Sequence, residues 1–263
     1  MPQLEVVKES IYDHPKYYDL VFGADCAAEL KYIRACGDEY VSGKVHRMFE
    51  PACGTGRLLI PLAKKGFDVA GIDLNPKAIE FCNQRLERAG FRPTAWVADM
   101  SDFDAPKKKY DVAFNTINSF RHLHTERQSI GHLRAMGRAI RKGGIYLLGV
   151  HLTPTKAPAS ETESWSARRG NLAVNTHMWT IDRNRKTRIE KFGIRFDIHT
   201  PKKSWRIDDM LVLRSYTAPQ MAKLIRDCGD WDWIASHDFH YQIDEPTVVD
   251  ATSEDVVYVL RRR

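Results

Sequence analysis

A glycine turn and a carboxylate, seventeen residues apart, are the residues best suited to hold a ligand. The apolar run that begins at Met48 ends in Cys53-Gly54-Thr55-Gly56, and Asp73 ends the next apolar run. Glycine lets the backbone turn sharply and leaves no side chain between the main chain and a ligand. The helix expected after the turn offers unpaired N–H groups, and an acid about 20 residues on can accept both hydroxyls of a ribose. The spacing predicts a cofactor that carries a nucleoside.

The glycine pattern does not match a dinucleotide fingerprint. That fingerprint needs a third glycine where Leu59 stands, and Glu50 would repel a pyrophosphate. The stretch instead resembles motif I of the class I S-adenosylmethionine-dependent methyltransferases, in the form E/D-x-x-C-G-T-G-R. The resemblance implies S-adenosylmethionine as the cofactor, with its amino-acid end over the glycine turn and its ribose on Asp73.

The same resemblance implies further cofactor contacts. Asp99, at the end of the strand expected over 94–100, would accept from the adenine amino group, and the N–H of Met100 would meet a ring nitrogen. A cap for the turn that follows is the alternative role of Asp99. Tyr18, in YYDLVF, matches a tyrosine that closes over the cofactor, and a buried structural tyrosine is the alternative. The expected cofactor-binding residues are Tyr18, Glu50, Ala52, Cys53, Gly54, Gly56, Asp73, Leu74, Asp99, Met100 and Asn115.

The methyl acceptor is expected beside the strand over 110–116. Open α/β sheets bind ligands at the carboxyl ends of their strands, and this strand delivers Asn115 there. The segment that follows resembles the family's D-x-V-x-x-x-x-N-S-x-x-H-L, which faces the transferred methyl group. The resemblance makes Asn118, Phe120, Arg121 and His122 active-site candidates. His122 is the expected catalytic residue, as a proton acceptor or a substrate contact, and a structural histidine is the alternative.

The elements that position these residues predict an α/β fold. Helices are expected over 77–88, 125–140 and 217–228, and strands over 67–72, 144–151 and the two last runs, 231–242 and 256–263. This order predicts a Rossmann-like, doubly wound, mostly parallel sheet with an antiparallel last strand. The cofactor domain is expected over 47–152 and 215–263, with an N-terminal helical lid over 1–46.

An insertion is expected between the two parts of that domain, over 153–214. Residues 153–170 read as a polar loop, and three strand-like runs follow over 171–214. In 191–199, apolar residues alternate with polar ones, which is the period of a strand with one buried face. The insertion is therefore expected to be an antiparallel β-sheet that covers the active site. A contact between the subunits of a homodimer is the alternative role, and the two roles are compatible.

Composition limits the function further. The 263 residues carry a net charge of +6, without the interleaved basic and aromatic residues of RNA-binding segments. No apolar run is long enough for a membrane helix, and the first residues lack a signal-peptide pattern. Five dispersed cysteines indicate reduced thiols, and no metal site is expected. We expect a cytoplasmic protein with neither a membrane nor a nucleic-acid partner.

The predicted function is methyl transfer to a small-molecule amine or hydroxyl. A neutral amine needs little more than alignment with the methyl group, whereas a hydroxyl needs a base, for which His122 is the candidate. The chain lacks the N/D-P-P-Y/F motif for planar nitrogens and the Pro-Cys nucleophile of cytosine enzymes. Three alternatives remain: a tRNA or protein methyltransferase, an NAD-linked oxidoreductase, and a non-catalytic module that senses S-adenosylmethionine.

Overall fold

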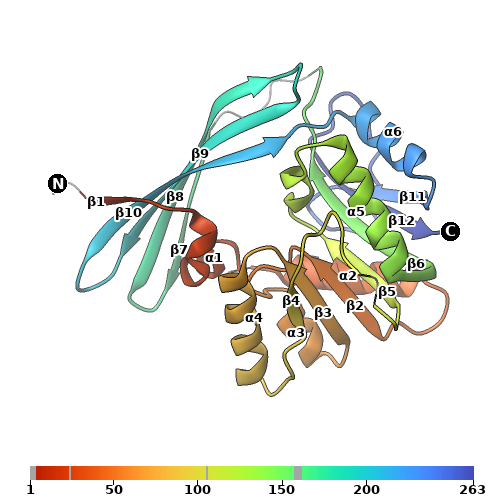
Figure 1. The fold of residues 1–263 in the computed structure, drawn as a ribbon, viewed down its shortest axis with the longest axis horizontal. Coiled ribbons are helices and arrows are strands. Elements are labelled where there is room, and N and C mark those ends of the chain that lie inside the picture. Colours follow the sequence, from red (N-terminus) through yellow and green to blue (C-terminus); the bar gives the residue numbers. More distant parts are fainter. Residues whose placement is uncertain (1–3, 24, 105, 157–161) are drawn as a thin grey trace.

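The computed structural model describes residues 4–23, 25–104, 106–156 and 162–263, which form two β-sheets with helices around one of them (Figure 1). The larger sheet has seven strands in the order β11-β12-β6-β5-β2-β3-β4. Its strands are β2 (Arg47–Pro51), β3 (Asp68–Asp73), β4 (Ala95–Val97), β5 (Tyr110–Asn115), β6 (Ile140–His151), β11 (Trp231–His237) and β12 (Asp255–Arg262). β2 to β6 run parallel, and β12 is antiparallel to both β6 and β11. The predicted Rossmann-like sheet with an antiparallel last strand is confirmed.

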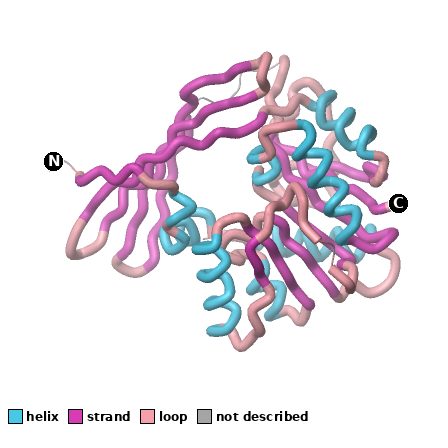
Figure 2. Tube along the Cα trace, viewed as in Figure 1, coloured by secondary structure: helices cyan, strands magenta, loops and turns pink. Residues whose placement is uncertain are grey.

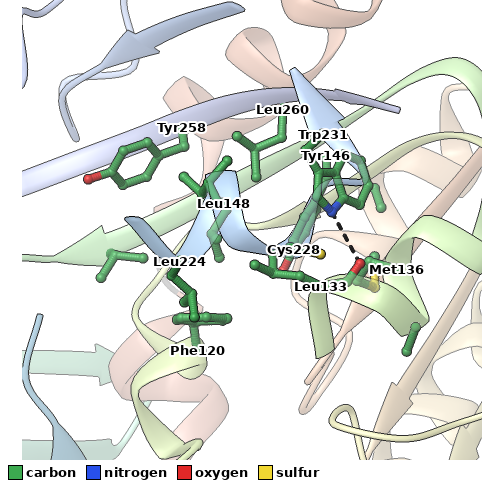
Figure 3. Packing of buried hydrophobic residues seen from close by; sticks show 14 of the residues in the cluster. Phe120, Leu133, Met136, Tyr146, Leu148, Leu224, Cys228, Trp231, Tyr258 and Leu260 are labelled. Carbon is green, nitrogen blue, oxygen red and sulfur yellow. Dashed lines mark hydrogen bonds between the residues drawn. The ribbon is translucent and has the colours of Figure 1, made fainter. Parts of the chain in front are cut away.

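Helices cover both faces of this sheet (Figure 2). α5 (Glu126–Ala139) and α6 (Ala218–Cys228) bury their apolar stripes in one core cluster. α2 (Ala27–Tyr40), α3 (Leu59–Lys64) and α4 (Pro76–Arg88) pack into a second cluster. The first cluster is closed by Trp231, whose indole N–H donates to the Leu133 carbonyl at 3.2 Å (Figure 3). This packing fixes the carboxyl ends of the parallel strands, where the candidate residues lie.

The smaller sheet has five strands in the order β1-β10-β9-β8-β7. They are β1 (Glu5–Lys8), β7 (Thr162–Arg169), β8 (Leu172–Asn184), β9 (Ile189–His199) and β10 (Ser204–Arg214). The predicted alternation holds in β9, where Ile194, Phe196 and Ile198 are fully buried. They pack with Leu20 and Val21 of α1 (Pro15–Phe22), so the inner face of this sheet is closed by the N-terminal segment.

Several predicted elements differ from the structure. The loop predicted over 153–170 is wrong over Thr162–Arg169, which form β7, and residues 157–161 of that loop lie outside the described residues. The N-terminal segment contains a strand as well as helices, because β1 pairs in parallel with β10. The sheet is thus antiparallel only from β7 to β10. β4 and β11 are shorter than predicted.

Candidate active site

A cavity of about 970 Å³ lies where the carboxyl ends of β2, β3 and β5 meet the inner face of the smaller sheet. Segment 10–22 also borders the cavity; it contains the short 3₁₀ helix η1 (Ile11–Asp13) and α1. Ten of the eleven residues expected to contact the cofactor line the cavity, and so does His122. Gly56 does not line it. The carboxyl edge of the sheet and the insertion therefore enclose one common space.

The glycine turn presents bare backbone to this cavity. Gly54 has φ +51°, and no atom lies within 4 Å of the position that a Cβ would take there. Ala52 has the same left-handed conformation, with φ 55°. Gly56 is required for a different reason, because a Cβ there would lie 2.5 Å from the Cys82 sulfur of α4. Gly56, which was expected to contact the cofactor, instead packs against α4 beneath the turn.

Asp73 holds the glycine turn and faces the cavity from the end of β3. One carboxylate oxygen accepts from the Gly54 N–H and the other from the Asn75 N–H, both at 2.8 Å. Burial raises the pKa of this carboxyl, and the backbone N–H groups oppose that rise. Each oxygen retains a further lone pair for a hydroxyl. The geometry suits a carboxylate that binds the two hydroxyls of a ribose.

Two buried acceptors beside the turn have no hydrogen-bond partner among the residues that the structure describes. Glu50 Oε2 and Asn115 Oδ1 are both buried, and both residues line the cavity. Burial raises the pKa of Glu50 well above its usual range. Asn115 Nδ2 donates to the Pro51 carbonyl at 2.9 Å, which holds the amide in place. A buried acceptor without a donor is costly, and the ammonium group of S-adenosylmethionine is a donor of the kind that these oxygens lack.

The opposite end of the cofactor region is lined by apolar side chains and is open to solvent. Leu74, Ala98 and Met100 line the cavity there, and Leu74 is 71% exposed. Asp99 lines the cavity as well, but its carboxylate accepts from the Ser101 N–H at 2.7 Å, which is the turn role left open by the sequence. An apolar slot at a solvent edge suits an adenine ring. The residues present therefore fit the amino-acid, ribose and adenine parts of S-adenosylmethionine.

His122 reaches the cavity from η2 (Ser119–His122), the 3₁₀ helix after β5. Its Nε2 is 3.0 Å from the Tyr12 hydroxyl. Burial, with smaller effects of His124 and Arg121, lowers the pKa of His122 to about 4. The imidazole is therefore neutral at pH 7 and can accept a proton.

Two other candidates from the same segment have different roles. Phe120, expected at the active site, is fully buried in the core beneath α5 and α6, so that prediction is wrong. Asn118 lines the cavity, but its side chain accepts from the His151 N–H at 2.7 Å. Asn118 therefore fixes the end of β6 against the loop after β5.

Tyr12 is a site residue that the sequence did not single out. Its backbone carbonyl accepts from the Asn75 side chain at 3.0 Å, and Ile11 N–H donates to Asp209 of β10 at 2.9 Å. Tyr18 lies beside it, with ring centres 5.4 Å apart. Burial raises the pKa of Tyr18 to about 12, so its hydroxyl stays protonated. The only available signal was the aromatic composition of this segment, which does not distinguish Tyr12 from its neighbours.

The buried carboxylate of Asp19 fastens α1 over the glycine turn. It accepts from the Thr55 hydroxyl at 3.1 Å and from Arg169 of β7 at 3.1 Å, and it forms an ion pair with Arg85 of α4. Arg85 also donates to the Thr55 carbonyl at 2.9 Å. One side chain of the N-terminal segment therefore joins the turn, a helix of the larger sheet and the smaller sheet.

Within the part of the chain that the structure describes, no group of three or more His, Cys, Asp or Glu side chains is placed to hold a metal ion. The five cysteines are free thiols. None of the described helices is both long enough and apolar enough to span a membrane.

Comparison with known proteins agrees with these features. Residues 49–144 match a family model described as a methyltransferase domain. A Bacillus subtilis protein named as a methyltransferase, YqeM, is 31% identical over 106 residues, which are 40% of this chain and 42% of that protein. The chain thus spans less than half the length of this curated relative. The matched region contains the glycine turn, Asp73, Asp99 and His122.

Solved structures extend the similarity in fold to nearly the whole chain. An S-adenosylmethionine-dependent methyltransferase from Clostridium acetobutylicum superposes with a TM-score of 0.76 at 15% identity, over 94% of this chain and 96% of that one. The sugar N-methyltransferase KedS8 from Streptoalloteichus superposes with a TM-score of 0.74 at 18% identity, over 100% and 98% of the two chains. Both comparisons include the smaller sheet in the shared fold.

Proposed function

We propose that the chain is a class I S-adenosylmethionine-dependent methyltransferase and that it methylates an amine or a hydroxyl of a small molecule. The observation that carries this proposal is the common cavity, in which the cofactor residues of β2, β3 and β5 share one space with His122 and the inner face of the smaller sheet. A space closed by a second sheet favours a small acceptor over a macromolecule. The similarity in fold to KedS8, a sugar N-methyltransferase, is in line with this class of acceptor.

The residues of the site have different roles in the reaction. When bound, S-adenosylmethionine supplies a methyl group on a positively charged sulfur. Asp73 and the glycine turn orient the ribose and the amino-acid end, and Glu50 and Asn115 accept from the ammonium group. Tyr12 and Tyr18 cover the cavity and exclude water. Each of these contributions positions one reactant against another, which is the protein's main share in an in-line displacement.

His122 removes the proton where the acceptor needs it. Its neutral imidazole accepts a proton from a hydroxyl, and the hydrogen bond with Tyr12 orients the ring. A neutral amine can attack before it loses its proton, so His122 then acts as a positioning contact. The same site can therefore methylate an amine or a hydroxyl, and only the rate of O-methylation depends on His122 as a base.

We further propose that residues 1–46 and 153–214 act as two lids over the cofactor domain formed by 47–152 and 215–263. The ion pairs of Asp19 and the hydrogen bond between Ile11 and Asp209 support this division, because they join the two lids above the glycine turn. A homodimer contact through the outer face of the smaller sheet is compatible with it.

The test is release of S-adenosylhomocysteine from a panel of amine and hydroxyl metabolites. The proposal expects turnover with at least one small acceptor and none with bulk tRNA or a denatured protein mixture. Calorimetric binding of S-adenosylmethionine without release of product for any acceptor would instead favour a sensing module. Product release with tRNA alone would refute the small-molecule assignment.

A further inference from the structure

A buried histidine joins the core to the segment that is expected to bind adenine. His132 of α5 is fully buried, as is Tyr146 of β6. The Nδ1 atom of His132 lies 2.9 Å from the carbonyl oxygen of Met100, and its Nε2 atom lies 2.8 Å from the hydroxyl of Tyr146. Met100 lines the cofactor end of the cavity, whereas His132 and Tyr146 do not. The imidazole therefore connects a cavity residue to a strand of the larger sheet.

The two partners determine which ring nitrogen of His132 carries the proton. A carbonyl oxygen can only accept, so Nδ1 bears the hydrogen and donates to Met100. Burial lowers the pKa of His132 to about 4, so the ring is neutral at pH 7. In a neutral ring with this tautomer Nε2 has a lone pair, which accepts from the hydroxyl of Tyr146. Both hydrogen bonds therefore have a defined direction, from Tyr146 to His132 and from His132 to Met100.

The peptide group between Met100 and Ser101 extends this chain of hydrogen bonds to Asp99. Its carbonyl accepts from His132, and its N–H, that of Ser101, donates to the carboxylate of Asp99 at 2.7 Å. A planar peptide group that is held at both ends does not rotate freely, and hydrogen bonds in such a chain strengthen one another. The carboxylate that is expected to accept from the adenine amino group is therefore held, through one peptide group, by a histidine of the core.

The helix that carries His132 also contacts this segment directly. A Cβ at Gly131 would lie 2.7 Å from the carbonyl oxygen of Ser101, so glycine is needed for α5 to approach the segment so closely. Nearer the end of α5, Arg138 donates to the carbonyl of Phe103 at 3.4 Å, and the Phe103 ring is buried in the core. The segment after β4 therefore follows the surface of α5, with His132 at the point closest to the cavity residues.

We propose that His132 is a positioning residue for the recognition of adenine, because it holds the Met100 peptide so that Asp99 and the Met100 N–H face the edge of the ring. Its role is indirect, since it lies behind the segment and does not line the cavity. The inference rests on the proposed function, in which S-adenosylmethionine brings the adenine. A site whose polar groups are held in place rejects a base with the opposite pattern of donors and acceptors.

Calorimetric titration with S-adenosylhomocysteine and with S-inosylhomocysteine measures this recognition. The two ligands differ only in the base. Hypoxanthine has an oxygen in place of the amino group and a hydrogen on the neighbouring ring nitrogen, so a donor and an acceptor exchange places at the edge of the ring. We expect the unaltered protein to bind S-adenosylhomocysteine about 10- to 100-fold more tightly.

Two substitutions separate the hydrogen bond to Met100 from the packing of the ring. The amide nitrogen of asparagine can take the place of Nδ1, so His132→Asn keeps the donor to Met100 and loses the contact with Tyr146. The amide of glutamine reaches the place of Nε2, so His132→Gln keeps the contact with Tyr146 and loses the donor to Met100. His132→Gln should bring the two Kd values within about threefold of each other, mainly by weakening S-adenosylhomocysteine, and His132→Asn should keep most of the preference.

A second buried histidine supplies the matched control. His237 is also fully buried and lies between the Tyr32 hydroxyl, at 2.8 Å from Nδ1, and the Ile243 carbonyl, at 3.1 Å from Nε2. None of these three residues lines the cavity. The two ring nitrogens have exchanged partners relative to His132, so His237→Asn is the variant that loses the donor to the carbonyl. It should lower the thermal stability and keep the preference for adenine.

The positioning role and the proposed function fail in different ways. Equal affinity of the unaltered protein for the two ligands, a preference retained in folded His132→Gln, or an equal loss in His132→Asn would overturn the positioning role and leave the methyltransferase function standing. Nitrogen NMR of the histidine rings tests the geometry without a variant, because a proton on Nε2 of His132 instead of Nδ1 would overturn the role as well. Binding of neither ligand by the unaltered protein would overturn the proposed function, and the positioning role with it.

Discussion

Replacing Asp73 by asparagine should weaken the binding of S-adenosylmethionine about 100-fold and leave the fold intact. The carboxylate accepts two backbone N–H groups at 2.8 Å, one on each oxygen, and its remaining lone pairs are available for two ribose hydroxyls. Asparagine keeps one acceptor oxygen and replaces the other by an NH₂ group, which cannot accept from a hydroxyl or from a backbone N–H.

The magnitude follows from the hydrogen bonds that change. One charge-assisted bond to a hydroxyl is lost, which costs about 1.5–3 kcal/mol, and the second becomes a neutral bond of about half the strength. The sum is roughly 3 kcal/mol, which corresponds to about 100-fold in Kd. Acid should act in the same direction, because protonation of Asp73 removes the same charge. Affinity should therefore fall as the pH falls through the raised pKa of this carboxyl.

Calorimetric titration with S-adenosylmethionine measures the effect, and thermal unfolding checks that the variant folds. Asp68→Asn is the matched control, because Asp68 begins the same strand, is 60% exposed and does not line the cavity. Its Kd should stay within about twofold of that of the unaltered protein. A folded Asp73→Asn protein with a Kd within about threefold of the original would refute the assignment of the ribose to Asp73.

The other predictions concern the base and the lid. His122→Ala should lower kcat about 100-fold or more for a hydroxyl acceptor, with little change in cofactor Kd; equal losses of both would exclude His122 from the acceptor site. For such an acceptor, kcat/KM should stay level from pH 8 to 5 and fall towards pH 4, because protonation of His122 removes the base; a fall centred near pH 6.5 would contradict the burial of this imidazole. Asp19→Ala should lower the free energy of unfolding in urea by about 2–3 kcal/mol, because it leaves Arg85 and Arg169 without their shared carboxylate. A decrease below about 0.5 kcal/mol would show that this cluster does not fasten the N-terminal lid.

The cofactor half of the site could be predicted because its geometry is local. Cys53, Gly54 and Asp73 lie within one strand–turn–helix–strand unit, in which backbone conformation and spacing fix the relative positions of the parts. The hydrogen bond from Gly54 to Asp73 joins residues only 19 positions apart, at the two ends of this one turn–helix–strand segment. Sequence patterns of period 2 and 3.6 describe such a unit well.

The contacts of the acceptor half could not be predicted, because they join distant parts of the chain. Tyr12 and His122 are 110 residues apart, and Arg121 and Glu190 are 69 apart. No local pattern shows which residues of the smaller sheet face the larger one. β7 was missed because this edge strand is exposed along most of both faces, with only Trp165 and Ala167 partly buried, so its sequence lacks a clear alternation.

Three consecutive residues of η2 explain both the error at Phe120 and the position of His122. In a 3₁₀ helix successive side chains point about 120° apart. Phe120 enters the core under α5 and α6, Arg121 reaches Glu190 of the smaller sheet, and His122 turns to Tyr12 of the N-terminal segment. The imidazole is therefore held by the packing of both sheets and by the lid at once. A change at Glu190 alters the environment of His122 through Arg121, whose charge contributes to its lowered pKa.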